Sequence, residues 1–164
     1  MNEINIKDIR KNVVKMISED WALVTAGNKD GWNTMTISWG GVGELWGKDV
    51  VFVFIRPQRY TKEFMDREGR FTLNFFDGEY KKELGLCGKY SGRDCDKAKE
   101  TGLIPIFDGD NVYIEQANTV IVCKTLSVEH LNPENFIDKN IEDFYPNKDY
   151  HEVYIAEIEK ILEK

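Results

Sequence analysis

The sequence has 164 residues, about the length of one domain, and 41% of them are hydrophobic against 31% charged. This balance is typical of a soluble globular protein and excludes a disordered or low-complexity chain. The formal net charge of −7 argues against a nucleic-acid partner, because such affinity depends on Lys and Arg contacts to phosphates. No apolar run reaches the roughly 18 residues of a membrane span, and Met1–Ser18 lacks the apolar segment of a signal peptide, so we expect a cytoplasmic protein.

The cysteines and histidines form no recognisable metal or disulfide pattern. Cys87, Cys95 and Cys123 include no C-x-x-C pair, so we expect reduced thiols. His130 and His151 lie far apart and outside any zinc-binding spacing, so no metal is expected and both are interpreted as structural. A nucleophilic Cys–His pair is an alternative that no local motif supports.

The first half of the chain changes from a helical pattern to strands. Apolar residues at helical spacing predict a short amphipathic helix over about 7–17. β-branched and aromatic runs, each bounded by Gly, Asn, Asp or Pro, then predict four strands. These are Trp21–Ala26, Trp32–Trp39, Val50–Ile55 and Phe71–Phe76. The Asp30-Gly31 turn signal predicts that the first two strands form a hairpin.

Short helices separate these strands from a second group. Thr61–Glu68 is predicted as a helix that Thr61 caps and Gly69 ends. Further helices are expected at Tyr80–Leu86 and Asp94–Thr101, and a short one within 132–149. The later strands are predicted at Tyr113–Ile114, Thr119–Val128 and Val153–Ile158. Six or seven strands without regular β-α-β alternation indicate a mainly β protein with short helices, folded as an antiparallel barrel.

One strand carries a row of hydroxyl side chains. The period of two divides it into an apolar face and a hydroxyl face, namely Met35, Ile37 and Trp39 against Thr34, Thr36 and Ser38. The hydroxyl face either meets solvent or contacts a ligand. The glycines within 40–43 favour a ligand, because missing side chains let a flat molecule approach the backbone. Neither a P-loop nor a G-x-G-x-x-G fingerprint is present there.

Two basic turns that precede helices are candidate anion sites. In Arg56–Thr61, two guanidinium groups and the free N–H groups of a helix start converge on a volume suited to a phosphate. Lys89–Asp94 is a second basic turn before a helix, and it contains hydroxyl groups and a glycine. Both turns also have a structural interpretation. In the first, Thr61 caps the helix and Arg56 or Arg59 pairs with a surface carboxylate; in the second, Asp94 caps the helix.

Four segments, in order, resemble the FMN-binding split-barrel flavin reductase family, especially its flavoredoxin-like branch. They are Asn33–Gly40, Arg56–Thr61, Asn74–Phe76 and Ser91–Asp94, and the likeness extends from about Trp21 to Ile158. The resemblance implies one FMN-binding domain over 1–164, with a Greek-key split β-barrel at about 21–158. It further implies a homodimer that binds FMN non-covalently near the subunit interface.

The resemblance also assigns cofactor-binding residues. Thr34, Met35, Thr36, Ser38 and Trp39 would lie along the flavin and its ribityl chain, Arg56 and Thr61 near the phosphate, Asn74 and Phe75 beside the ring, and Lys89, Ser91 and Arg93 at further polar contacts. No side chain is expected to be catalytic, because the flavin itself carries the chemistry.

The implied activity leaves three functions open. The first is an NAD(P)H-dependent flavin reductase, an NAD(P)H:flavin oxidoreductase that transfers hydride through flavin N5. The second is a flavoredoxin-type electron-transfer protein, which exchanges electrons with a redox protein and does not oxidise nicotinamide. The third is a binding module without redox activity.

Overall fold

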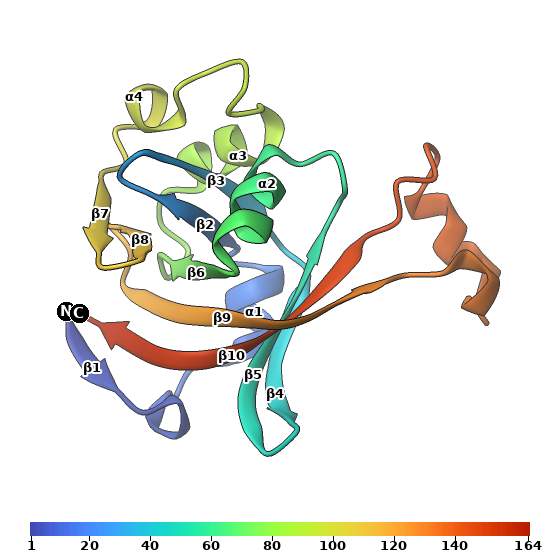
Figure 1. Ribbon diagram of the computed structural model, residues 1–164, viewed down its shortest axis with the longest axis horizontal. Helices are drawn as coiled ribbons and strands as arrows, with labels where there is room; N and C mark the ends of the chain where they lie inside the picture. Colours follow the sequence, from blue (N-terminus) through green and yellow to red (C-terminus); the bar gives the residue numbers. More distant parts are fainter.

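Short helices surround a long, curled antiparallel sheet in the computed structural model, which describes residues 1–164 (Figure 1). The strands are β1 (Asn2–Ile4), β2 (Ala22–Asn28), β3 (Gly31–Ile37), β4 (Gly40–Leu45), β5 (Lys48–Ile55), β6 (Arg70–Phe75), β7 (Pro105–Asp108), β8 (Asn111–Ile114), β9 (Thr119–His130) and β10 (Glu152–Glu163). The helices are α1 (Val13–Ser18), α2 (Tyr60–Glu68), α3 (Lys81–Lys89) and α4 (Lys97–Thr101), with 3-10 turns at Ile6–Asp8, Pro133–Asn135 and Lys139–Phe144. None of the helices combines the length and apolar character needed to cross a membrane.

The strand order explains why the sheet curls. Neighbours follow the order β3-β2-β6-β9-β10-β5-β4, with β1 added to β10 and all pairs antiparallel. β3 and β4 lie at opposite ends of this order, yet only Ser38 and Trp39 connect them. The two ends must therefore approach each other, and register shifts between β9 and β10 help these long strands bend. The expected mainly β, antiparallel split barrel is confirmed.

Alternation along the strands supplies two hydrophobic clusters. Val24 and Ile121 belong to the main core inside the curled sheet, where Met16 and Ile17 of α1 also pack. Leu23 belongs to a second cluster on the opposite face, under α3 and β8. Burial on both faces accounts for the long apolar runs of β2 and β9.

The predicted β2–β3 hairpin is confirmed, with Asn28 opposite Gly31. Asn28 Oδ1 accepts a hydrogen bond from the main chain of Asp30 at 2.9 Å, which stabilises the turn. Gly27 has a φ of +117°, and a Cβ atom there would lie 2.3 Å from the carbonyl oxygen of Gly31. Only glycine fits this position.

We therefore expect Gly27→Ala to lower the free energy of unfolding by about 2–4 kcal/mol, through backbone strain and overlap with main-chain atoms. Urea denaturation measures this loss. Gly41→Ala is the matched control, because a Cβ at Gly41 meets no atom within 4 Å. Equal stability of the two variants would contradict the expectation.

Several predicted boundaries are wrong. The segment over 40–43, for which no strand is predicted, forms β4 and pairs with β5, and a Cβ at Gly40 would lie 2.6 Å from the Phe52 carbonyl oxygen. The glycine there allows close strand packing. The predicted helix over 7–17 is a 3-10 turn followed by the short α1, which Asn12 caps. β7 was not predicted at all.

The predicted helix caps are partly corrected. Gly69 ends α2 in the left-handed conformation, as predicted. Arg59, not Thr61, occupies the N-cap position of α2, and no side chain caps it. Asp94 is not a cap either, because α4 begins later and the Asp96 side chain accepts the hydrogen bond of Lys99 N at 3.1 Å.

Candidate functional site

A groove runs along the free edge of β3. Because β3 pairs only with β2, alternate main-chain groups along it face away from the sheet. The Thr34 carbonyl is one of these, since it accepts a hydrogen bond from Lys97 Nζ at 2.6 Å. The same alternation turns the main-chain groups of Thr36 and Ser38 outward. The strand thus offers hydrogen-bonding backbone to a ligand.

Two adjoining cavities make up this groove, and both are lined by Met35 and Arg59. The first, which we call the Trp39 cavity, has a volume of about 220 Å³ and is lined by Met35, Thr36, Ile37, Ser38, Trp39, Phe54, Arg56, Arg59 and His151. The second, the Ser91 cavity, has about 170 Å³ and is lined by Asn33, Met35, Gln58, Arg59, Tyr60, Thr61, Lys89, Tyr90, Ser91, Gly92 and Lys97. We refer to them together as the β3 groove.

Aromatic rings form one wall of the Trp39 cavity. The Trp39 indole lies 5.0 Å from the His151 ring and 5.6 Å, edge to face, from Phe144. Trp39 follows the end of β3 and is 41% exposed, so it does not join Met35 and Ile37 in the core as the alternation predicted. Its indole is instead a candidate surface for a planar ligand.

His151 belongs to this cavity, although the sequence indicated a structural role. Its Nδ1 lies 2.9 Å from the Tyr145 hydroxyl, and its Nε2 has no hydrogen-bond partner in the protein. Burial, with a smaller effect of the Arg56 charge, lowers the pKa of His151 to about 4. At neutral pH the cavity therefore contains an uncharged imidazole with one nitrogen available to a ligand.

The pKa shift of His151 predicts a loss of stability in acid. A histidine normally titrates at about 6.5, so between this pH and about 4 the unfolded chain binds a proton that the folded chain does not. We expect the free energy of unfolding to fall by roughly 2–3 kcal/mol across this window through His151. Urea denaturation at pH 7 and 4.5 measures this, and His151→Phe should show less of the fall. His130→Gln, at a 75% exposed side chain, is the control and should behave as wild type. The same fall in His151→Phe as in wild type would contradict the assignment.

Arg56 stabilises the wall of the Trp39 cavity. Its guanidinium forms an ion pair with Asp149 at 2.6 Å, donates to the Phe144 carbonyl at 2.9 Å and lies 5.1 Å from the centre of the Tyr145 ring. It therefore ties the segment between β9 and β10 to the end of β5, which was the structural interpretation of this arginine. Arg56 lines the Trp39 cavity and not the cavity of Thr61.

The Ser91 cavity collects donors for an anion. The main-chain N–H groups of Tyr60 and Thr61 start α2 and have no hydrogen-bond partner in the protein. Arg59 projects here and uses one nitrogen to bond the Gly88 carbonyl at 2.8 Å. Burial, together with the Arg56 charge, lowers the pKa of Arg59. An anion in this cavity would offset both the burial of Arg59 and the repulsion from Arg56. Lys89, in the same wall, could also contact it.

The two threonine hydroxyls of the β3 row bond to the protein itself. Thr34 Oγ1 bonds the Val24 carbonyl at 3.1 Å and the Thr25 hydroxyl at 2.8 Å, both buried. Thr36 Oγ1 donates to the Leu84 carbonyl of α3. Thr61 is also fully buried, and its hydroxyl accepts from Asn33 Nδ2 at 2.9 Å. The groove therefore presents the backbone edge of β3, and not a ladder of threonine hydroxyls.

Other predicted residues lie outside the groove. Asn74 is fully buried, and its side chain bonds the Leu23 carbonyl at 3.1 Å and the Ile114 amide at 2.8 Å. Phe75 packs in the main core. Arg93 forms an ion pair with Glu63 and lines a neighbouring cavity. The structure thus brings Met35, Thr36, Ser38, Trp39, Arg56, Thr61, Lys89 and Ser91 to the groove and leaves Thr34, Asn74, Phe75 and Arg93 out of it.

One buried cation, Lys97, was not predicted from the sequence. Lys97 Nζ donates to the carbonyls of Thr34 at 2.6 Å and Cys87 at 2.8 Å, and the residue is only 5% exposed. Burial lowers its pKa to about 8. This lysine joins α4, β3 and α3 beneath the groove, and its place in a polar, helix-forming stretch carries no signal of that role.

The curled sheet and the cationic groove along one strand edge define a split barrel of the flavin reductase type. Its fold is similar to that of flavoredoxin from Desulfovibrio vulgaris, with a TM-score of 0.68 and 21% sequence identity over 88% of this chain and 69% of that chain. It is also similar to flavoredoxin from Methanosarcina acetivorans, with a TM-score of 0.65 and 20% identity over 100% of this chain and 75% of that chain. An FMN-binding protein from Thermus thermophilus, solved with bound 1-cyclohex-2-enone, is similar as well, with a TM-score of 0.68 and 18% identity over 99% of this chain and 80% of that chain. No curated protein matches the chain in sequence. The chain belongs to the flavin reductase like domain family, whose profile matches residues 15–164.

Proposed function

We propose that the chain is one flavin-binding domain that holds FMN non-covalently in the β3 groove and acts as an NAD(P)H-dependent flavin reductase. One observation carries the proposal: a cavity rich in anion donors adjoins a cavity with an aromatic wall, along one free strand edge. FMN has a phosphate at one end and a planar ring at the other. The groove therefore fits it in both chemistry and order.

The Ser91 cavity contains the donors that would bind the phosphate end of FMN. The main-chain N–H groups of Tyr60 and Thr61, which have no partner in the protein, would donate to the phosphate at the positive end of α2. Arg59 and Lys89 would neutralise its charge. The Ser91 hydroxyl oxygen already accepts from Arg93 N at 3.2 Å, and its own hydrogen remains available to the phosphate.

Residues of the Trp39 cavity would hold and orient the ring of FMN. The outward main-chain groups of Thr36 and Ser38 would bond the polar edge of the ring, while Trp39 and His151 limit its position. When bound, FMN supplies a ring that accepts and stores hydride equivalents. The uncharged His151 imidazole would offer the ring a hydrogen-bonding group.

The first test is a fluorescence titration of FMN with the purified protein, followed by rapid mixing with NADH and with NADPH under anaerobic conditions. We expect saturable quenching at one FMN per chain and fast bleaching of the flavin absorption band. FMN binding without bleaching by either nucleotide would contradict the reductase and support the flavoredoxin-type electron carrier. Absence of FMN binding would contradict both.

We also propose that the chain is a homodimer. The segment between β9 and β10 extends away from the barrel (Figure 1). Near the groove it exposes 57% of Phe144 beside Trp39, and further along it exposes 96% of Ile137. Exposed apolar residues of this size favour a protein partner. Light scattering should give twice the 19.1 kDa mass of one chain, and Phe144→Glu should shift the mass toward that of the monomer; a monomeric wild type would contradict the proposal.

A further inference from the structure

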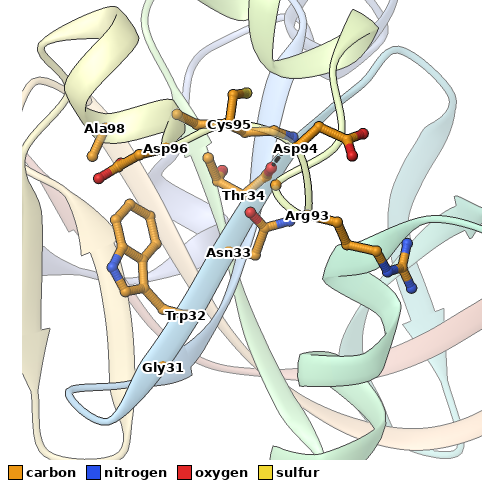
Figure 2. A pocket seen from close by; sticks show the side chains of 11 residues that line it. Gly31, Trp32, Asn33, Thr34, Arg93, Asp94, Cys95, Asp96 and Ala98 are labelled. Atoms are coloured by element: carbon orange, nitrogen blue, oxygen red, sulfur yellow. Dashed lines mark hydrogen bonds between the residues drawn. The ribbon is translucent and has the colours of Figure 1, made fainter.

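Two further cavities differ in their relation to the β3 groove. The first, of about 490 Å³, lies between the Trp32 indole and the start of α4 (Figure 2) and shares Asn33, Gly92 and Lys97 with the Ser91 cavity, so it continues the groove. The second, of about 420 Å³, shares no residue with the groove. We call it the β10 cavity, and it is lined by Glu3, Ile4, Asn5, Ile6, Asp49, Ile158, Glu159, Lys160 and Ile161.

The β10 cavity coincides with a gap in the sheet. β9 pairs with one side of β10, so β1 and β5 share its other side (Figure 1). On that side the pairing with β5 ends at Glu157, and the pairing with β1 begins at Ile161. No strand lies opposite Ile158–Lys160 there, and these residues make no main-chain hydrogen bond outside the strand ladders. The gap therefore leaves unpaired strand edge, with room for about three extended residues.

The charges around the β10 cavity favour a cation. The charged side chains that β10 contributes are already paired, one with Arg70 and the other with Asp108. The carboxylates of Glu3 on β1 and Asp49 on β5, at the two ends of the gap, have no hydrogen-bond or ion-pair partner. Asp49 also lies opposite Glu44 in the pairing of β4 with β5. Like charges in such a pair destabilise the sheet, and a bound cation would relieve them.

The inner wall of the β10 cavity is apolar. Ile161 belongs to the main core, and Ile4, Ile6 and Ile158 pack against it. Because side chains alternate along a strand, an extended ligand would turn one side chain toward this wall and the next toward solvent. The cavity therefore suits a short peptide with both apolar and cationic side chains.

We propose that the β10 cavity binds the basic N-terminal end of a partner protein as a short added strand. Main-chain groups of this segment bond to the free edge at Ile158–Lys160, and its cations contact Glu3 and Asp49. β1 and β5 close the gap at its two ends, so a chain end fits better than the middle of a chain. The two carboxylates repel a C-terminus and attract an α-amino group. This site is independent of the flavin proposal.

The test uses the tripeptide Lys-Val-Lys amide, whose valine can face the apolar wall, in isothermal titration calorimetry with the full chain. We expect one peptide per chain with a dissociation constant of about 10 μM to 1 mM. Acetylation of the peptide's α-amino group, Glu3→Gln and Asp49→Asn should each weaken binding by about 2- to 5-fold. Glu134→Gln is the control, because Glu134 is an exposed carboxylate on the distant segment between β9 and β10. Hydrogen exchange at Ile158–Lys160 should slow when the peptide binds.

Three outcomes would overturn the proposal. The first is no saturable binding of the tripeptide at millimolar concentration. The second is an unchanged dissociation constant in both Glu3→Gln and Asp49→Asn. The third is binding of spermidine as tightly as the tripeptide without slower exchange at Ile158–Lys160, which would indicate a simple cation site. Urea denaturation checks that the variants fold, and we expect wild-type stability because neither carboxylate has a partner to lose.

Discussion

Replacing Arg59 with Ala is expected to weaken FMN binding by about 2–3 kcal/mol, roughly a 30- to 150-fold increase in the dissociation constant. Arg59 is the only arginine that lines both cavities of the β3 groove, and it is partly buried beside the uncapped start of α2. A charge-assisted hydrogen bond to phosphate is stronger in such a place than on the open surface. FMN titration of the variant measures the change directly.

Arg67→Ala is the matched control for this variant. Arg67 lies in the last turn of α2, the helix that begins directly after Arg59; it is 53% exposed and pairs with Glu68, outside the groove. It should bind FMN as wild type does. Circular dichroism checks that Arg59→Ala is folded, since the lost bond to the Gly88 carbonyl is its main structural change. An unchanged dissociation constant in a folded Arg59→Ala variant would remove Arg59 from the phosphate site.

Lys97→Met is expected to lower the free energy of unfolding by about 2–4 kcal/mol at pH 7, because the carbonyls of Thr34 and Cys87 each lose a charge-assisted hydrogen bond. Methionine keeps nearly the same shape, so packing contributes little to the difference. Lys99→Met is the control, because Lys99 is an exposed residue of the same short helix. Urea denaturation of the three proteins measures the loss.

The pH dependence separates this role from ordinary packing. Folding lowers the pKa of Lys97 from 10.5 to about 8. Between these two pH values the unfolded chain therefore binds a proton that the folded chain does not. Burial destabilises the charged ammonium in the folded protein. As the pH rises from 8 to 10.5 the folded protein loses this charge first, and wild type gains free energy of unfolding. The stability gap between wild type and Lys97→Met should therefore widen from pH 8 to pH 10. A constant gap would contradict a buried, titrating ammonium.

The strands were predictable because their signals are local. Alternation, β-branched runs and the Asp30-Gly31 turn identified β2, β3, β5 and β6 to within a few residues. β4 was missed because its glycines look like a loop, and they serve close packing on β5, which depends on a partner strand. Helix starts were misplaced for a similar reason, since Asp94 and Asp96 are equally good caps until packing selects one.

The site was predictable only in part. The basic turn at Arg56–Thr61 and the strand edge at Met35–Trp39 do meet in one groove, as the resemblance implied. Periodicity showed which face the threonines share, but it could not show that their hydroxyls bond to the barrel and to α3. His151 and Lys97 entered the site through long-range folding, which leaves no trace in local spacing.

A crystal structure of the protein grown with FMN would show whether the β3 groove is the flavin site. We expect yellow crystals in which the phosphate lies against the main-chain N–H groups of Tyr60 and Thr61 and against Arg59. The ring should then lie along the Thr36–Ser38 edge, beside Trp39. Colourless crystals grown with excess FMN, or flavin bound away from the edge of β3, would contradict it.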